Sequence, residues 1–131
     1  MNIGEVAAAT GLPAKTIRYY ESVGLIDPPA RSGGNYRLYD ERHVATLRFI
    51  QHARRLGFSV AQVAALVALW RDKRRASADV RRLAVAHLDE IDARIAELKQ
   101  MRQSLQSLVD RCHGDHRPDC PILDEFAETE N

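Results

Sequence analysis

The chain has 131 residues, of which 45% are hydrophobic, enough for one small domain with a core and an extension. Its net charge of +1 is the sum of a basic and an acidic half. Residues 1–75 hold 12 Lys or Arg and 6 Asp or Glu, whereas residues 76–131 hold 7 Lys or Arg and 12 Asp or Glu. A basic first half predicts a nucleic-acid partner for that half alone. No stretch approaches the roughly 20 apolar residues of a membrane span, and the first residues lack the pattern of a secretory signal. These features argue against a membrane partner and predict a cytoplasmic protein.

Two short helices are predicted at the start of the chain, separated by a glycine turn. Asn2 can cap a first helix over residues 3–10, and Gly11 ends it. Pro13 suits the first turn of a second helix over residues 14–23. Two short helices across a tight turn are typical of a helix-turn-helix, in which the second helix reads DNA.

A segment rich in proline and glycine follows, over residues 25–40. Its short apolar alternation predicts a two-stranded wing that turns near residues 32–34. Asp40 can then cap a third helix that ends near residue 56, and Ser59 can cap a fourth that ends near residue 71.

A long helix is predicted from Ser77 or Ala78 to about Arg111, after a polar interruption at residues 72–79. At about 1.5 Å per residue it is roughly 50 Å long, and no other segment can cover its apolar stripe. We therefore expect a homodimer in which this helix pairs with its counterpart as an antiparallel coiled coil. The stripe comprises Leu88, Ile91, Ile95, Leu98, Leu105 and Val109.

The predicted fold is therefore mainly α. It comprises a winged helix-turn-helix domain at residues 1–75, a dimerisation helix at 76–111, and a metal-binding loop, short helix and tail at 112–131.

The second helix has one face suited to the core and one suited to DNA. Ile17 and Tyr20 fall on the inward face, whereas Lys15, Arg18 and Tyr19 fall together on the other. Cations and a phenol on one helix face suit the phosphates and base edges of a major groove. The wing and the third helix add further polar and cationic side chains. The predicted DNA-binding residues are Lys15, Thr16, Arg18, Tyr19, Arg31, Asn35, Tyr36, Arg37 and Arg54.

The only two cysteines, Cys112 and Cys120, lie in the segment RCHGDHRPDCPILDEF. Cytosolic thiols stay reduced, so a close pair is more typical of a metal or redox site than of a structural disulfide. Two thiolates favour a soft, low-coordinate monovalent ion, with Cu(I) the leading choice. Tetrahedral zinc would need further ligands, which His113 and His116 can supply, so a divalent sensor stays open. A thiol redox switch, in which the two cysteines join, also stays open.

A short last helix is predicted from Pro121 to about Phe126, because proline suits a first helical position. The exposed amides at its start would stabilise negative charge on the sulfur of Cys120. Two thiolates and a monovalent cation leave one net negative charge, so this helix end favours an ion of charge +1.

The run TGLPAKTIRYYESVGLIDPPARSGGNYRLYD resembles the amino-terminal signature of the MerR family of bacterial transcription regulators. The matching features are TIRYYE, the GLI-P segment after it, and the N-Y-R-x-Y wing. The resemblance implies a winged helix-turn-helix dimer that binds double-stranded promoter DNA across an over-long spacer. It also implies that the dimer bends and untwists this spacer so that RNA polymerase can use both promoter elements.

The pattern C-x7-C-P-I further resembles the copper-responsive, CueR-like branch of that family. Divalent-ion sensors of the family carry a cysteine at the start of the dimerisation helix, where this chain has Ser77. The resemblance therefore implies an activator of copper efflux or resistance promoters that senses Cu(I), Ag(I) or Au(I), with Ser77 as a selectivity residue. The sequence has no constellation typical of an enzyme. A protein that only forms a coiled coil would leave the basic helix and wing unexplained.

Overall fold

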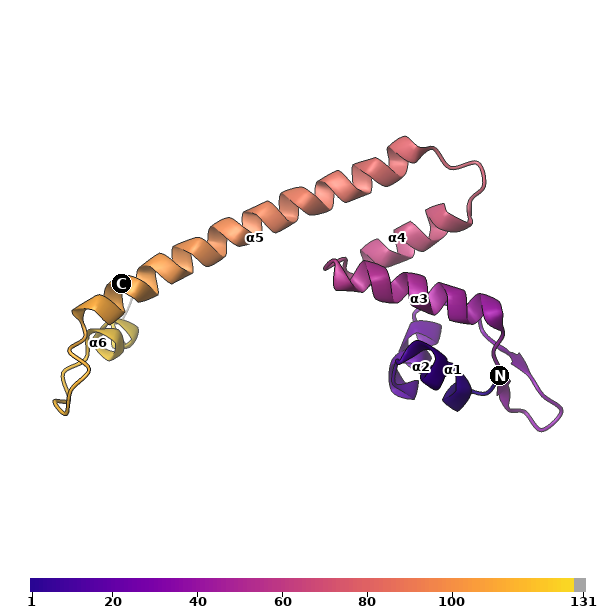
Figure 1. Ribbon diagram of the computed structural model, residues 1–131, viewed down its shortest axis with the longest axis horizontal. Coiled ribbons are helices and arrows are strands. Elements are labelled where there is room, and N and C mark those ends of the chain that lie inside the picture. Colours follow the sequence, from indigo (N-terminus) through magenta and orange to yellow (C-terminus); the bar gives the residue numbers. More distant parts are fainter. Residues whose placement is uncertain (129–131) are drawn as a thin grey trace. The chain divides into compact units, whose positions relative to one another are not determined.

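The computed structural model describes residues 1–128, which form six helices and one two-stranded sheet (Figure 1). This mainly helical architecture confirms the expected fold class. The chain divides into two units, one from Met1 to Ala84 and one from Val85 onward. The domain ranges expected from the sequence, 1–75, 76–111 and 112–131, remain predictions, and the last three residues lie outside the described chain. Within residues 1–128, no helix is both long and apolar enough to cross a membrane.

Helix α1 (Ile3–Thr10) begins where the sequence predicts, because its first turn is capped on both sides. The Asn2 side chain accepts a hydrogen bond from the Glu5 amide at 2.8 Å, and the Glu5 carboxylate accepts one from the Asn2 amide at 3.2 Å. This capping box satisfies two amide donors that a helix start leaves open. Gly11 ends the helix with a φ of 75°, a left-handed conformation that favours glycine.

Helix α2 (Ala14–Ser22) starts at Ala14, as expected, and ends one residue before the expected Val23. Pro13 has a φ of −62° and a ψ of 145°, so it is extended and precedes the helix. Its ring fixes φ but leaves ψ free, and the extended ψ directs the chain into the helix from the turn.

Helices α3 (Glu41–Arg55) and α4 (Val60–Arg71) also begin with capping boxes. Asp40 pairs with His43 in the first, and Ser59 pairs with Gln62 in the second. The expected starts of both helices are therefore confirmed.

The wing consists of β1 (Ala30–Arg31) and β2 (Arg37–Leu38), which pair antiparallel. Ala30 lies opposite Leu38, and Arg31 lies opposite Arg37. The turn between them closes where the Asn35 amide donates to the Ser32 carbonyl at 2.9 Å. The turn therefore falls at the Ser-Gly-Gly segment, as expected from the sequence.

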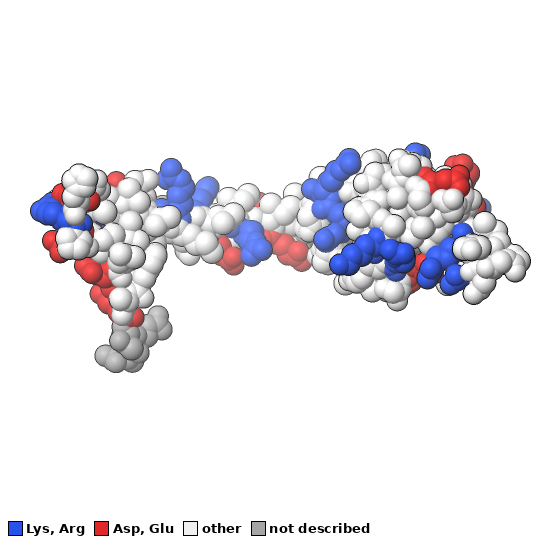
Figure 2. Space-filling model, turned by 90° about the horizontal axis from the view of Figure 1, so that it is seen from below, with Lys and Arg blue, Asp and Glu red and all other residues white. Residues whose placement is uncertain are grey.

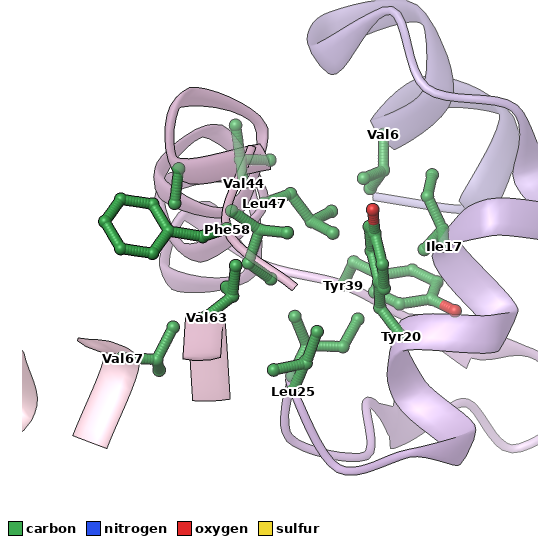
Figure 3. Packing of buried hydrophobic residues seen from close by; sticks show 13 residues of the cluster. Val6, Ile17, Tyr20, Leu25, Tyr39, Val44, Leu47, Phe58, Val63 and Val67 are labelled. Atoms are coloured by element: carbon green, nitrogen blue, oxygen red, sulfur yellow. The ribbon is translucent and has the colours of Figure 1, made fainter. Parts of the chain in front are cut away.

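The core of the first unit lies where α1, α2, α3 and α4 meet (Figure 3). Val6, Ile17, Leu47, Ile50 and Val63 are each fully buried there. Their convergence fixes the side of α2 that faces inward, and therefore the side that faces solvent.

One aromatic pair lies at the edge of this core. Phe49 of α3 stacks on Trp70 of α4, with ring centroids 4.5 Å apart and planes at 11°. Trp70 remains 40% exposed. The helical period of α4 places the indole toward α3, but at the rim of the core.

Helix α5 (Ser77–Arg111) has 35 residues and carries the expected apolar stripe along its exposed side. Ile91, Ile95 and Leu98 are 37%, 44% and 56% exposed within one chain. An apolar stripe of this length, interrupted only at Arg102, requires a partner surface when it lies on a lone helix. Helix α6 (Pro121–Ala127) follows the cysteine loop and begins at the proline, as expected.

Candidate DNA-binding surface and metal centre

The exposed face of α2 presents the side chains expected to meet DNA. Ile17 and Tyr20 are buried, whereas Lys15 and Arg18 are exposed and Tyr19 is 49% exposed. The division between the two faces arises because the inward pair packs into the core of the first unit. Figure 2 shows Lys and Arg groups across this unit, with fewer Asp and Glu groups on the face in view.

A surface groove joins α2 to the end of α3. Lys15, Thr16 and Tyr19 line it together with Arg54. Arg54 is held in place because its guanidinium donates a hydrogen bond to the Phe58 carbonyl at 2.8 Å. A fixed cation beside an exposed basic helix suits a DNA phosphate.

The wing gathers the other expected residues in a second groove. Arg31, Asn35, Tyr36 and Arg37 line it, beside the start of α1. Arg31 donates to the Asn35 carbonyl at 3.3 Å, and the Tyr36 side chain is 75% exposed. The structure thus brings eight of the nine expected residues into two grooves of one unit. Arg18 is exposed on α2 but lines neither groove. The contacts of all nine residues with DNA remain predictions.

Two residues near Arg37 were not anticipated from the sequence. Glu21 of α2 lies with a carboxylate oxygen 3.3 Å from Arg37 Nε, and the same oxygen accepts a hydrogen bond from the Tyr39 hydroxyl at 3.2 Å. The available signal was that Glu21 is the one acidic residue of α2, a helix that also carries Lys15 and Arg18.

Cys112 and Cys120 come together at the junction of α5 and α6. Cys112 follows the last residue of α5, and Cys120 is the residue that precedes α6. Their sulfur atoms lie 4.0 Å apart, and both residues are partly buried. At a metal–sulfur distance of about 2.3 Å, two sulfurs lie about 4.6 Å apart across a linear ion and about 3.8 Å apart in a tetrahedral site. The pair therefore fits one soft metal ion with little movement.

The surroundings of Cys120 favour its thiolate form. The Leu123 amide donates to the sulfur and lowers the pKa of the Cys120 thiol, and the Ile122 amide and the Cys112 thiol act in the same direction. Burial and the Asp124 carboxylate oppose this shift of the pKa. The thiolate is the form that binds a metal.

Ion pairs fix the loop and the last helix. Arg111 at the end of α5 lies 3.4 Å from the Glu125 carboxylate of α6, and Arg117 lies 2.8 Å from Asp115 within the loop. The Arg111–Glu125 pair joins the end of α5 to α6, and the Arg117–Asp115 pair orders the loop between them.

The remaining expected residues are not gathered at this pair. His113 and His116 are exposed in the loop. Within residues 1–128, no group of three or more His, Cys, Asp or Glu side chains is placed to hold a metal ion. Ser77 is the exposed first residue of α5 and belongs to the first unit, so its role in selectivity remains a prediction.

A basic winged helix-turn-helix joined to a long helix with an apolar stripe defines a DNA-binding transcription regulator. Residues 1–69 match the model of the MerR HTH family regulatory protein, and residues 44–108 match that of the MerR DNA-binding region. The chain belongs to the MerR family. Regulators of this family are not enzymes; they bind promoter DNA as dimers and act with RNA polymerase.

Relatives in this family match nearly the whole chain. The HTH-type transcriptional regulator HmrR of Rhizobium leguminosarum bv. viciae is 55% identical over 128 residues, which cover 98% of both chains. The HTH-type transcriptional regulator CueR of Salmonella typhimurium is 43% identical over 127 residues, covering 97% of this chain and 92% of the relative. The crystal structure of PbrR691 from Ralstonia metallidurans CH34 in complex with lead(II) matches with a TM-score of 0.86 and 33% identity, covering 97% and 99%.

Proposed function

We propose that this chain is a metal-responsive activator whose effector is Cu(I), with Ag(I) or Au(I) as substitutes, bound by Cys112 and Cys120. The 4.0 Å separation of the two sulfurs carries this proposal, because it brings two soft ligands within reach of one ion. A metal effector is further supported by the heavy-metal-dependent regulator of Rhizobium meliloti, which is 50% identical over 127 residues.

The choice of a monovalent ion follows from charge and from the relatives. Two thiolates around a +1 ion keep one negative charge, and the amides of Leu123 and Ile122 stabilise negative charge on Cys120. The CueR relative supports copper, whereas the lead(II) complex of PbrR691 shows that the same architecture accommodates a divalent ion. Bound Cu(I) would supply a soft link between the end of α5 and the start of α6.

At the other end of the chain, the two grooves of the first unit would hold DNA. Lys15, Arg18 and Arg54 would contact phosphates or base edges from α2 and α3, and the wing residues would contact the adjoining backbone. Two copies would engage the two halves of a pseudo-palindromic site. Distorting a short duplex costs on the order of a few kcal/mol, which contacts from two DNA-reading units can supply.

Titration of the reduced dimer against a Cu(I)-selective chelator tests the metal assignment. Under this proposal one Cu(I) binds per pair of cysteines more tightly than the chelator holds it, and Zn(II) competes poorly. If the protein cannot withdraw Cu(I) from the chelator, the proposal is wrong. Preferential binding of Zn(II) would favour the divalent alternative. If an oxidant joins the two cysteine thiols and the reduced protein has no affinity for Cu(I), a redox switch is favoured instead.

Arg18→Ala is expected to weaken DNA binding about tenfold, since one good contact to a base or phosphate contributes roughly 1–3 kcal/mol. Fluorescence anisotropy with labelled duplex measures this loss, and Cu(I) affinity should be unchanged because the cysteines lie in the other unit. Arg94→Ala is the matched control, because Arg94 is an exposed arginine of α5 that pairs only weakly with Glu97 at 3.9 Å. Equal losses in the two variants would contradict the assignment of Arg18.

Ser77→Cys is expected to increase the response to divalent ions relative to copper, because a thiolate is a far better ligand for soft metals than a hydroxyl. The ratio of Zn(II)-induced to Cu(I)-induced transcription measures the change. Ser77→Ala provides the control without a new ligand. An unchanged ratio in the cysteine variant would limit Ser77 to a structural role at the start of α5.

A further inference from the structure

Glu21 occupies an unexpected place for an acidic residue. It lies near the end of α2, in the unit that faces DNA, and its side chain is only 15% exposed. One carboxylate oxygen accepts a hydrogen bond from the Tyr39 hydroxyl at 3.2 Å and lies 3.3 Å from Arg37 Nε. The carboxylate therefore joins α2 to strand β2 of the wing and to the residue that follows it.

Of the two partners of Glu21, Tyr39 is held firmly by the fold. Tyr39 is 2% exposed, and its amide donates to the Met1 carbonyl at 2.7 Å. Burial first and the Glu21 carboxylate second raise the pKa of the Tyr39 hydroxyl, so that it stays a proton donor to Glu21. Arg37 Nε is buried without an aligned hydrogen bond, so the nearby carboxylate stabilises it through charge.

A carboxylate on a DNA-reading unit has an electrostatic cost. Phosphates repel it, and its removal alone should strengthen binding by raising the positive potential of the surface. A structural gain must therefore offset this cost, and organising groups that bind DNA is one such gain. Glu21 is placed to organise such groups, because its partner Arg37 lies directly opposite Arg31 in the wing and next to the exposed Tyr36.

We infer that Glu21 is a positioning residue of the DNA interface, which fixes Arg37 and Tyr39 and thereby holds the wing at a set orientation to α2. Arg37 then acts mainly as the link between the wing and α2, and Arg31 and Tyr36 act on the DNA from the strand and turn that it holds. This inference rests on the DNA interface proposed above and is independent of the metal.

The test compares Glu21→Ala and the isosteric Glu21→Gln with the wild-type dimer, on the duplex that the wild type selects from random-sequence DNA. Both variants should bind more weakly, by about tenfold for alanine and less for glutamine, which still accepts from Tyr39. The slope of log affinity against log salt should stay unchanged, because no phosphate contact is added. Tighter binding with a steeper salt slope, the result that electrostatics alone predicts, would overturn the inference.

Two controls separate positioning from other effects. Glu41→Gln removes an acidic side chain from the exposed first turn of α3, and it should leave affinity unchanged or raise it. In an Arg37→Ala background, Glu21→Gln should lose most of its effect, because the linked partner is already absent. Additive losses in the double variant would overturn the inference. If the proposed DNA interface is itself wrong, the result differs: Lys15→Ala then binds the same duplex as tightly as the wild type.

Discussion

Replacement of Cys112 or Cys120 by serine is expected to abolish copper-induced transcription while leaving DNA binding within about twofold of the wild type. Loss of a single outer contact at a metal site costs roughly 10- to 100-fold in affinity, so loss of one of two direct ligands should cost more than about 100-fold. A reporter gene under the target promoter, combined with DNA binding by the metal-free protein, measures both quantities.

The loop supplies matched controls for this experiment. His113→Ala and His116→Ala remove exposed imidazoles beside the cysteines without changing a thiol. Both variants should respond to copper like the wild type. A normal response in either serine variant would refute the two-thiolate site, and loss of response in either histidine variant would show that an imidazole completes it.

Leu47→Ala is expected to reduce the free energy of unfolding of the first unit by about 2–5 kcal/mol, because it leaves a cavity in a fully buried part of the core. Trp70 is the only tryptophan of the chain and stacks on Phe49 of the same unit. Its fluorescence in a urea titration therefore follows the unfolding of this unit.

Leu38→Ala provides the comparison, because it removes the same atoms from a side chain that is 43% exposed in the wing. Its effect should stay below about 1 kcal/mol. Equal losses in the two variants would contradict the assignment of Leu47 to the core. Cu(I) affinity should survive in the Leu47 variant, because Cys112 and Cys120 lie in the second unit.

The helix starts were predictable because their causes are local. Asn2, Asp40 and Ser59 each bond to an amide three residues ahead, so a short stretch of sequence contains the whole interaction. The extent of α5 was predictable for a similar reason, since its apolar stripe repeats every three to four residues. The start of α2 at Ala14 was also predictable, although Pro13 lies just before the helix rather than in its first turn.

The contacts that organise the functional surfaces were not predictable from such patterns. Glu21 and Tyr39 are 18 residues apart, and only the packing of the wing against α2 brings them together. The sequence indicated that Cys112 and Cys120 could bind a metal together. The 4.0 Å distance between their sulfur atoms, however, depends on α6 folding back toward the end of α5. Sequence periodicity describes single elements, whereas these distances are set by tertiary contacts between elements.

The three capping boxes have a consequence for biosynthesis. Each lies at the start of a helix in the first unit, at Asn2, Asp40 and Ser59, and each is complete once three more residues have been added. Chains fold as they emerge from the ribosome, amino-terminal units first. The unit from Met1 to Ala84 emerges first, so a nascent chain can form its DNA-reading head while Cys112 and Cys120 are still inside the ribosome and not yet placed to capture a metal.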